Sequence, residues 1–598
     1  MPSDAPTAPP PPELTVRAVL TGMVIGAILT PCNVYSGLKI GWSFNMSVAA
    51  GLIAYALWNV LGRGRPLDLL ENNINQTSAS SAASIVSSGL AAPIPALTLL
   101  TGQTLAWHAL AIWLLVVSLL GVVVAAGLRN QMLVREHLTF PSGVVTAEAM
   151  QEIHAGGREA AARLRALAYA GAVAAGLKAV NDFIAAIPKL APPLNVPFVR
   201  VAEGARSGEG VSFLNLGIAL DPSLLMVGFG AIAGLRIGIS ALIGAAIAWG
   251  VLAPVALSNG WAEAGESADA PWFGTLVEWL LWPGATLMVV AALASLSISL
   301  GRLALRRAAR RDEQAAPASN EAAPEARITP RAVIAGFVVV LVCSVAAQTS
   351  YFAITILEAV AAVLLSYILA VVSARVSGET GITPIGALGK ITQFSFALIS
   401  PANITANLMS ANVTGGAAGQ AADLLHDLRT GQIIGATPGF QVIAQVFGVL
   451  AGSLAGAAAY LLLIPDPQAQ LLSPEWPAPA VATWKAVAEV LMDGLGALPP
   501  MAAPAMMLAA AAALVFAVAE RFLPLNMARY VPSATAMGLA FVIPAWNSIS
   551  LFIGALTGAL VLWLFPGLAP RRIVVIAAGL VVGESLMGVV SALSTIAQ

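Results

Sequence analysis

Two stretches of this chain carry many hydrogen-bonding side chains between long apolar segments. The first, residues 71–88, contains one carboxylate, three asparagines, one glutamine, one threonine and six serines. The second, residues 400–420, is rich in asparagine, and its Asn403-Ile404 pair matches Asn73-Ile74 of the first. Amide side chains donate and accept hydrogen bonds without charge, so they suit a zwitterionic or amide-rich solute. We predict that both stretches line one wet cavity near the middle of a membrane.

Each polar stretch also has a structural interpretation that the sequence leaves open. Such a stretch cannot face lipid, because polar or irregular backbone at membrane depth is tolerated only inside protein or beside water. A broken or re-entrant helix fits residues 71–88, and an ordinary exposed loop is the alternative. For residues 400–420 the alternative is adhesion between helices, which amide side chains also provide within membranes.

Carboxylates within apolar runs are candidate proton carriers, because an acidic side chain inside a membrane is costly and commonly functional. Glu584 lies 12 residues after Arg572 in an apolar run, about 18 Å along a helix and therefore near the midplane. A structural hydrogen bond is the alternative role for Glu584. Glu358 and Asp182 lie nearer to predicted span ends, where we expect them to anchor the interface. Three further carboxylates are candidate proton carriers: Glu71, Glu148 and Glu379.

Two lysines occupy matching places after glycine-containing motifs, Lys39 early in the chain and Lys390 in its second half. A carboxylate-bearing solute would neutralise either lysine, and an ion pair with Glu71 or Glu379 inside the fold is the alternative. The predicted substrate-binding residues are Asn33, Tyr35, Lys39, Asn72, Asn73, Gln76, Lys390, Asn403 and Asn407.

Signatures of other functions fail on inspection. Gly389-Lys390-Ile391 lacks the Ser or Thr and the upstream Gly of a phosphate-binding loop. The net charge of −1 gives no general attraction to nucleic acid. The histidines lack a second ligand at metal-site spacing, and two cysteines are too few for a thiolate site; these residues are His108, His137, His154, His426, Cys32 and Cys343. We predict no metal site, no cofactor, no nucleic-acid partner and no enzymatic activity.

The elements that must position these residues are membrane helices. Of the 598 residues, 58% are hydrophobic and 10% are charged, and the mean hydropathy is +0.84; soluble domains carry about 25% charged residues. Uncharged runs long enough to cross a bilayer recur at residues 107–127, 237–258, 279–301 and 332–357. The run 530–570 is broken near Pro544 and is predicted to form two spans. Fourteen to sixteen membrane segments are expected, giving an all-α polytopic membrane protein.

Charge placement predicts the orientation of the chain. Residues 1–13 are proline-rich and lack the pattern of a signal peptide, so they are expected to form a disordered cytoplasmic tail. The longest polar interruption, residues 302–331, opens with five arginines and should be cytoplasmic by the positive-inside rule. This linker separates two transmembrane halves, residues 14–301 and 332–598. We expect a multi-pass protein of the inner, or plasma, membrane.

Short patterns recur in the same order in the two halves, as expected for the internal repeats of secondary transporters, whose substrate site lies between the repeats. The offsets between the copies are unequal, so insertions must be assumed. The paired patterns are Thr30-Pro31 with Thr383-Pro384, Asn73-Ile74 with Asn403-Ile404, and Phe140-Pro141-Ser142-Gly143 with Val531-Pro532-Ser533-Ala534.

Four strings spread along the chain resemble motifs of the oligopeptide transporter superfamily in its bacterial form. They are Glu71-Asn72-Asn73-Ile74-Asn75-Gln76-Thr77, Leu138-Thr139-Phe140-Pro141-Ser142-Gly143, Asp423-Leu424-Leu425-His426-Asp427-Leu428-Arg429-Thr430-Gly431 and Gly583-Glu584-Ser585-Leu586-Met587-Gly588. The first three are most similar to the yellow stripe-like branch, whose members carry metal complexes of peptide-like chelators. The Asn-Pro-Gly-Pro-Phe motif of the eukaryotic peptide branch is absent.

This resemblance implies sixteen membrane helices in two pseudo-repeats, alternating access, and inward flux of substrate coupled to protons. The leading hypothesis is a proton-coupled importer of oligopeptides or peptide-like metal chelates. A passive channel and an integral membrane enzyme are the competitors, and a homodimer is one option for the oligomeric state. From the residues themselves, 423–431 are expected to form a short amphiphilic helix at a cytoplasmic elbow, away from the substrate.

Overall fold

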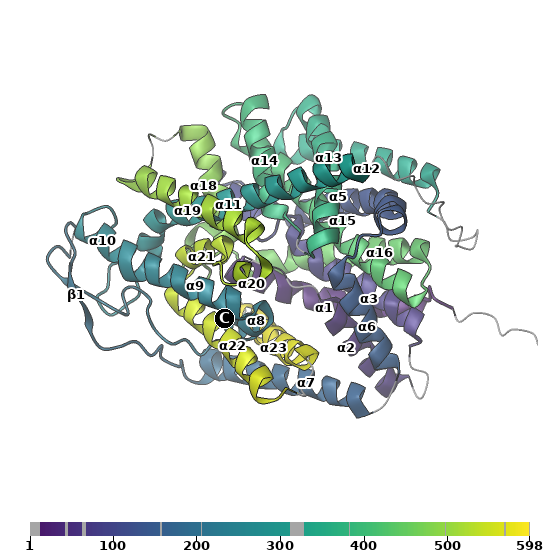
Figure 1. Ribbon diagram of the computed structural model, residues 1–598, viewed down its shortest axis with the longest axis horizontal. Coiled ribbons are helices and arrows are strands. Elements are labelled where there is room, and N and C mark those ends of the chain that lie inside the picture. The colour runs from purple at the N-terminus through teal and green to yellow at the C-terminus, as the bar shows by residue number, and fades with distance from the viewer. Residues whose placement is uncertain are drawn as a thin grey trace, which may run out of the picture.

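The chain folds as an all-α polytopic membrane protein. In the computed structural model the described residues are 12–41, 43, 46–62, 67–155, 158–204, 206–310, 328–381, 383–494, 496, 498–566 and 570–596. Most of the predicted tail, 1–13, and the central part of the predicted linker, 302–331, therefore lie outside the described residues. Figure 1 shows the helices packed as one body, with a small strand pair at one end.

The helices and strands divide between the two halves of the chain. The first half contains α1 (Val16–Ile40), α2 (Ser47–Leu61), α3 (Leu69–Ala83), η1 (Ser84–Ser88), α4 (Pro93–Thr101), α5 (Trp107–Arg129), η2 (Asn130–Arg135), α6 (Pro141–His154), α7 (Arg158–Ala179), η3 (Val180–Ile184), β1 (Asn195–Arg200), β2 (Gly210–Ser212), α8 (Leu224–Ala233), α9 (Leu235–Ile247), η4 (Ala248–Leu252), α10 (Ala253–Ser258) and α11 (Phe273–Arg310). The second contains α12 (Pro330–Phe352), α13 (Ile356–Thr380), α14 (Ile385–Ile399), α15 (Ile404–Ile434), α16 (Pro438–Leu463), α17 (Pro467–Gln470), α18 (Pro479–Asp493), α19 (Ala502–Phe522), α20 (Leu525–Ala528), α21 (Ala534–Phe541), α22 (Ala545–Leu564) and α23 (Pro570–Ile596).

Within the described residues, eleven helical segments are long and apolar enough to cross a bilayer. They are α1, α3 with α4, α5 with η2, α9 with α10, α11, α12, α13, α16, α19, α22 and α23. Helices α7 and α15 have 22 and 31 residues, which is also enough length to cross, but they are less apolar. A count based on hydropathy omits such helices, so sixteen spans remain a prediction.

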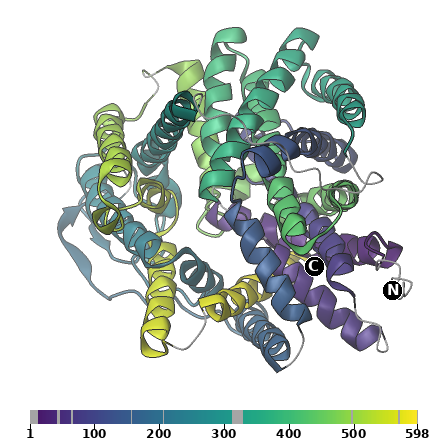
Figure 2. The same ribbon diagram turned by 45° about the vertical axis from the view of Figure 1, so that its right-hand side comes forward.

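The helices form two bundles, and each bundle takes helices from both halves of the chain. The first bundle combines α1–α6 with α12–α16, and the second combines α7–α11 with α19–α23. In Figure 2, purple helices from the start of the chain lie beside green helices from the second half. Helix α18 lies between the bundles, because it contacts α4 and α14 on one side and α11 on the other. The packing therefore crosses the predicted boundary between residues 14–301 and 332–598.

The predicted break in the polar segment 71–88 is confirmed. Helix α3 ends at Ala83, a 3-10 turn covers η1, and α4 begins at Pro93 after a short turn. Every residue of α3 from Glu71 onward is buried. The exposed-loop alternative for this segment is therefore wrong, since its polar side chains are enclosed by other helices.

Two other boundaries differ from the expectation. The run 530–570 does divide before Pro544, but α21 has only eight residues, about 12 Å of helix, and cannot cross a bilayer alone. Helix α11 continues to Arg310, beyond the predicted end of the first half at residue 301.

The expectation of a short elbow helix at residues 423–431 is wrong. These residues belong to α15, a continuous helix whose positions from Ala406 to Gly431 are nearly all buried. Asp427 is 2% exposed and His426 5%, and the His426 ring lies edge-on to Phe140 at 5.2 Å. The sequence looked amphiphilic because its polar side chains face other helices of the first bundle rather than water.

Glycines on α1 and α16 allow the backbones of these two helices to approach α3 closely. A methyl group at Gly26 of α1 would lie 2.5 Å from Ala82 Cβ of α3, and one at Gly448 of α16 would lie 2.1 Å from Ser78 O and 1.9 Å from Ser81 Oγ. Small residues at such crossings are typical of membrane helix packing, which depends on van der Waals contact rather than on water exclusion. The polar face of α3 is thus held between α1 and α16.

We expect Gly448→Ala to destabilise the protein, because the added methyl group meets the backbone of α3. Overpacking of this kind costs roughly 1–3 kcal/mol, so the thermal unfolding midpoint in detergent should fall by several degrees. Gly176→Ala is the matched control, since a methyl group at Gly176 on α7 meets nothing within 4 Å. Equal midpoints for the two variants would contradict the close packing of α3 and α16.

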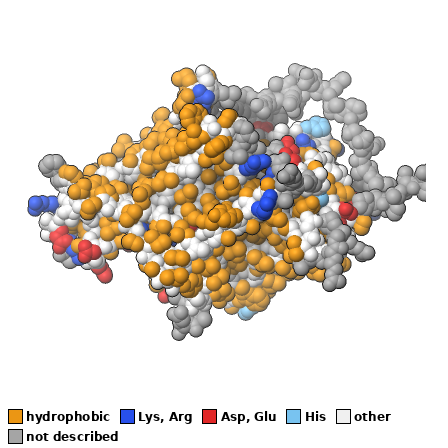
Figure 3. All heavy atoms as spheres, turned by 90° about the horizontal axis from the view of Figure 1, so that it is seen from below, with side chains coloured by type: hydrophobic (Ala, Val, Ile, Leu, Met, Phe, Trp, Pro, Cys, Tyr) orange, Lys and Arg blue, Asp and Glu red, His pale blue; other side chains and the backbone are white. Residues whose placement is uncertain are grey.

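The surface agrees with a membrane environment. Figure 3 shows one face of the molecule covered mostly by hydrophobic side chains, with few charged groups among the described residues. Lipid-facing positions of α12 and α19, such as Val342 and Leu508, are among the most exposed hydrophobic side chains. The antiparallel pair of β1 and β2 is a small element between α7 and α8.

Candidate functional site

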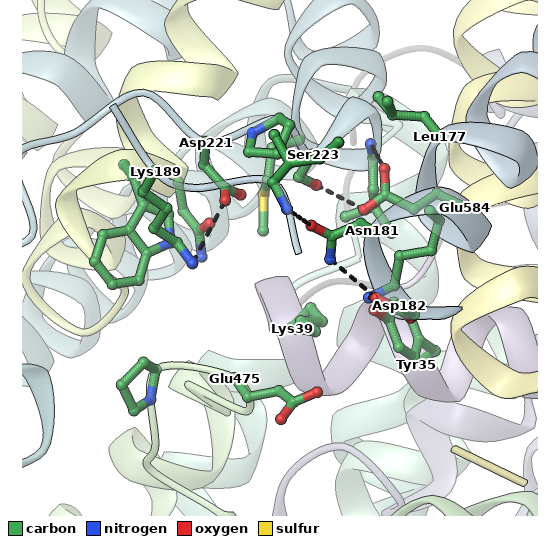
Figure 4. Close-up of a pocket in the computed structure, with 18 residues that line it drawn as sticks. Tyr35, Lys39, Leu177, Asn181, Asp182, Lys189, Asp221, Ser223, Glu475 and Glu584 are labelled. Carbon is green, nitrogen blue, oxygen red and sulfur yellow. Dashed lines mark hydrogen bonds and ion pairs between the residues drawn. The ribbon is translucent and has the colours of Figure 1, made fainter. Parts of the chain in front are cut away.

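A polar cavity of about 330 Å³ lies where the two bundles meet. The first bundle contributes α1, and the second contributes α7 with η3, α8, α22 and α23; the loop before α18 closes one side. Figure 4 shows the labelled side chains converging on this space from these elements. The polar residues that line it are Tyr35, Lys39, Lys178, Asn181, Asp182, Lys189, Asp221, Ser223, Glu475, Asn547 and Glu584.

Glu584 projects from α23 and ties it to the start of α8. Its Oε1 accepts a hydrogen bond from Ser223 Oγ at 2.7 Å, and its Oε2 accepts one from the backbone N–H of Leu225 at 2.7 Å. The first N–H groups of a helix lack partners within the helix and carry partial positive charge, so a carboxylate is stabilised there. Glu584 is 7% exposed and lines the cavity at the same time.

Two lysines of the cavity are already paired with carboxylates. Lys178 Nζ lies 2.9 Å from Asp182 Oδ1 one turn further along, and Asn181 Nδ2 donates to the same oxygen at 3.0 Å. Lys189 Nζ lies 3.6 Å from Asp221 Oδ1 and 4.8 Å from the centre of the Trp546 ring. Asp182 is therefore part of the cavity wall as well as being close to the end of a helix.

Lys39 is the lysine of the cavity without an ion pair among the described residues. Its ammonium group lies 5.5 Å from the ring centre of Tyr35 and 5.3 Å from that of Trp476, which contact each other edge to face. Aromatic faces attract a cation but do not neutralise it. Glu475 approaches the cavity from the side opposite Ser223, with Lys39 between them (Figure 4).

The cavity thus offers both signs of charge to a small solute. Lys39 can receive a carboxylate, while Glu475 and the Glu584 region can receive an ammonium group or a cationic complex. A volume of about 330 Å³ is at the lower end for binding sites of small molecules. Within the described part of the chain, no group of three or more His, Cys, Asp and Glu is placed to hold a metal ion by itself.

Of the predicted site residues, the structure brings Tyr35, Lys39 and Glu584 together at this cavity. They come from α1 and α23, which are more than five hundred residues apart in sequence and adjacent in space. Gly588 makes this approach close, since a methyl group there would lie 2.6 Å from the Tyr35 ring.

The two polar stretches do meet, as predicted, within the first bundle. Asn412 Nδ2 donates to Ser88 O at 2.9 Å, and Gln420 Nε2 donates to Ser84 Oγ at 3.1 Å. The stretches pack directly against each other, and neither contributes to the lining of the cavity between the bundles. A wet space that they share remains a prediction.

Several predicted substrate ligands join helices instead of lining this cavity. Asn33 Nδ2 donates to Ala83 O at 3.0 Å, Asn72 Nδ2 to Gly51 O at 3.2 Å and Asn407 Nδ2 to Gln393 O at 2.6 Å. All three contacts join helices, which is the alternative that the sequence left open for residues 400–420, here Asn407. A direct role of these amides in substrate binding remains a prediction.

The remaining predicted ligands lie elsewhere in the first bundle. Gln76 Nε2 donates to Asp427 Oδ1 at 2.6 Å, and Lys390 Nζ lies 4.1 Å from the ring centre of Trp484. The Asn73 amide is fully buried, and neither of its polar atoms has a hydrogen bond to another described residue. Asn403 Oδ1 accepts from Ala406 N at 2.9 Å and so caps the start of α15.

We expect Asn73→Ala and Asn403→Ala to have different effects, because Asn73 is a predicted substrate ligand and Asn403 also caps a helix. Losing one hydrogen bond to a substrate costs roughly 0.5–1.5 kcal/mol, so Asn73→Ala should weaken substrate binding with little loss of stability. Asn403→Ala removes a helix cap worth about 1 kcal/mol and should lower the unfolding midpoint. Substrate titration and thermal unfolding of both variants check this, and unchanged affinity in both would count against them as ligands.

The other three candidate proton carriers occupy different surroundings. Glu71 forms an ion pair with Arg17 and accepts from Thr15 Oγ1 at 2.7 Å. Glu148 is half-buried on α6, and Glu379 is exposed near the end of α13. Of the four candidates, Glu584 is the one that lines the cavity.

Sequence reasoning missed most of the second bundle's contribution to this wall. Lys178, Lys189, Asp221 and Glu475 sit near the ends of helices or in loops, where charged residues are ordinary and carry no distinctive spacing. A usable signal was that Asp221 and Glu475 each lie next to a proline, Pro222 and Pro474 respectively, since proline interrupts a helix. Asp427, which is buried, and Asp423, which is half-buried, were also missed, because they were assigned to a surface elbow.

Comparison with known proteins identifies the family. The family model described as OPT oligopeptide transporter protein matches residues 13–595. The chain belongs to the oligopeptide transporter family. It is therefore a multi-pass membrane transporter and not an enzyme, and the match covers both bundles and the cavity between them.

Relatives of this transporter align along most of their lengths. The putative oligopeptide transporter YGL114W of Saccharomyces cerevisiae is 24% identical over 97% of this chain and 96% of its own. The iron-phytosiderophore transporter yellow stripe 1 of Zea mays is 24% identical over 91% of this chain and 85% of its own. A putative oligopeptide transporter of Haemophilus influenzae is 28% identical over 70% of this chain and 68% of its own.

Proposed function

We propose that this transporter imports oligopeptides or peptide-like metal chelates by proton-coupled symport with alternating access. The observation that carries the proposal is the cavity between the bundles, where Lys39, which has no ion pair among the described residues, faces acidic groups within about 330 Å³. A short peptide and an amino-carboxylate chelator both carry carboxylates and amines, which such a cavity could receive. The relatives named as an iron-phytosiderophore transporter and as oligopeptide transporters favour the same substrate classes.

The position of the cavity supports alternating access. Helices α1 and α23 come from different bundles and meet at the wall of the cavity. Rigid movement of one bundle against the other would open this space first to one side of the membrane and then to the other, which is the usual mechanism in transporters built from repeats.

Glu584 is the proposed proton carrier. A proton on this carboxylate would remove its charge and so weaken the charge-assisted hydrogen bonds from Ser223 and from the N–H of Leu225 without abolishing them. The link between α23 and α8 would therefore loosen when the proton binds. Glu71, Glu148 and Glu379 are the next candidates.

The proposed location is the inner, or plasma, membrane. The N-terminus and residues 302–331 are proposed to face the cytoplasm, because the five arginines at the start of that loop follow the positive-inside rule. A homodimer is the proposed assembly to test first, by cross-linking in membranes.

Transport by proteoliposomes under an imposed pH gradient tests the central proposal. Trialanine and the iron and nickel complexes of nicotianamine are suitable probes, preceded by a thermal-shift screen of peptides and chelates in detergent. A proton-coupled importer accumulates its substrate above the external concentration, saturably, and loses accumulation when an ionophore collapses the gradient. A passive channel would equilibrate the solute without saturation, and that result would overturn the proposal.

A further inference from the structure

The first bundle contains a second polar site, centred on Asp427 of α15. Asp427 is 2% exposed, and Gln76 of α3, which donates to its Oδ1 at 2.6 Å, is fully buried. The second carboxylate oxygen, Asp427 Oδ2, and the amide oxygen, Gln76 Oε1, are also buried. Neither has a hydrogen-bond partner among the described residues. Two acceptor oxygens next to the hydrogen bond between Gln76 and Asp427 therefore lack a donor.

The neighbouring hydroxyl does not fill this gap. Ser47 approaches the Asp427 carboxylate from α2, but its hydroxyl donates to Ser80 Oγ at 2.9 Å. A hydroxyl has one proton to donate, so Ser47 cannot donate to Ser80 and to Asp427 at once, and a hydroxyl does not neutralise a carboxylate. What the site lacks is a donor or a positive charge.

A second carboxylate adds to the negative charge. Asp423 lies one helical turn before Asp427, is half-buried and interacts with it electrostatically, and the hydroxyl of nearby Ser84 donates to Ser81 O at 3.1 Å. No ion pair to Asp423 or Asp427 occurs in the part of the chain that the structure describes. Buried carboxylates without a counter-charge are costly, so the pair requires a proton or a metal cation.

The charged groups around this part of α15 are engaged elsewhere. Helices α2 and α16 carry no charged residue, and His426 Nε2 contacts Ser377 Oγ at 3.0 Å. Among the ionic side chains on the other packed elements, Glu71 pairs with Arg17, Arg375 with Glu136, Glu152 with Arg163, and Arg429 with Gln432, while the ammonium group of Lys390 on α14 lies over the Trp484 ring at 4.1 Å.

We propose that Asp427, with Asp423 and the amide of Gln76, binds a monovalent cation between α3 and α15. The cation lies beside Asp427 Oδ2 and Gln76 Oε1 and neutralises the carboxylate pair. A sodium ion and a proton share this chemistry, since each supplies positive charge to acceptor oxygens. The site shares no residue with the cavity between the bundles, so it can be tested without the proposed substrate.

The test measures thermal unfolding of the full-length protein in nanodiscs without any substrate. Sodium chloride replaces choline chloride at constant ionic strength and at alkaline pH, where protons are scarce. A sodium site gives a saturable rise of several degrees in the unfolding midpoint, and Asp427→Asn abolishes the rise. Asp269→Asn, a change at an exposed loop aspartate, is the matched control and should respond like the parent.

A proton site gives a different pattern with the same variants. Sodium then has no effect, and infrared difference spectra show a protonated carboxylic acid that Asp427→Asn lacks and Asp269→Asn keeps. If Asp427→Asn does not fold, Gln76→Leu serves instead, since it retains both carboxylates and removes one acceptor; it should weaken the sodium response or shift the carboxylic acid band. Absence of both signals in the parent would overturn the proposal, as would unchanged signals in the variants. Neither result bears on the substrate cavity, which is tested by transport.

Discussion

Glu584→Gln is expected to abolish uphill, pH-driven accumulation of substrate while leaving counterflow exchange largely intact. Glutamine keeps the shape of the side chain, and its Oε1 can still accept from the Leu225 N–H, while its Nε2 can donate to Ser223 Oγ, because a hydroxyl also accepts. The link between α23 and α8 therefore survives. What is lost is the ability to bind and release a proton, on which net accumulation depends and exchange does not.

The measurement compares accumulation under a pH gradient with exchange of labelled substrate in the same proteoliposomes. Glu520→Gln is the matched control, because Glu520 pairs with Arg236 away from the cavity and its loss should change neither rate. If Glu584→Gln accumulates substrate as well as the parent, Glu584 is a structural link, and Glu148 and Glu379 become the next carboxylates to replace.

Lys39→Gln should raise the KM for transport about 10- to 100-fold with a smaller change in kcat. A hydrogen bond to a charged group contributes about 1.5–3 kcal/mol, and each 1.4 kcal/mol corresponds to about a tenfold change in affinity. Since Lys39 has no ion pair among the described residues, its removal leaves no carboxylate of the protein unpaired. The cost should therefore appear in substrate binding rather than in folding.

Trialanine and nickel–nicotianamine uptake, measured in parallel, check this expectation. Lys485→Gln is the control, because Lys485 pairs with Glu489 within α18 and lies outside the cavity. Equal KM values for Lys39→Gln and the parent with both probes would show that Lys39 does not receive the substrate carboxylate.

The sequence predicted the fold class and the contact between its two polar stretches, because hydropathy and the placement of amides are local properties. It also placed Glu584 correctly within a membrane helix. It could not predict that α15 is enclosed, since burial of Asp427 depends on Gln76 from a distant helix. The amphiphilic pattern of residues 423–431 is the same whether the polar side faces water or a polar neighbour.

The cavity was less predictable than the fold for a similar reason. Tyr35, Lys39 and Glu584 stood out because they interrupt apolar runs, whereas Lys178, Asp221 and Glu475 occupy positions where charge is common. Their importance comes from convergence in space, which depends on how α7, α8 and the loop before α18 meet. The asparagines are conspicuous in composition, and several of them hold helices together, while their role in substrate binding remains a prediction.

The mixing of the two halves within each bundle has a consequence for synthesis. The hydrogen-bond partner of Gln76, Asp427, is synthesised 351 residues later. At about 5–20 residues per second, synthesis of the intervening chain takes roughly 20–70 seconds. During that time the serine and asparagine face of α3 has no α15 or α16 to cover it. Lipid cannot satisfy that face, so the growing chain depends on the insertion machinery, or on water near the headgroups, to hold α3 until the second half arrives.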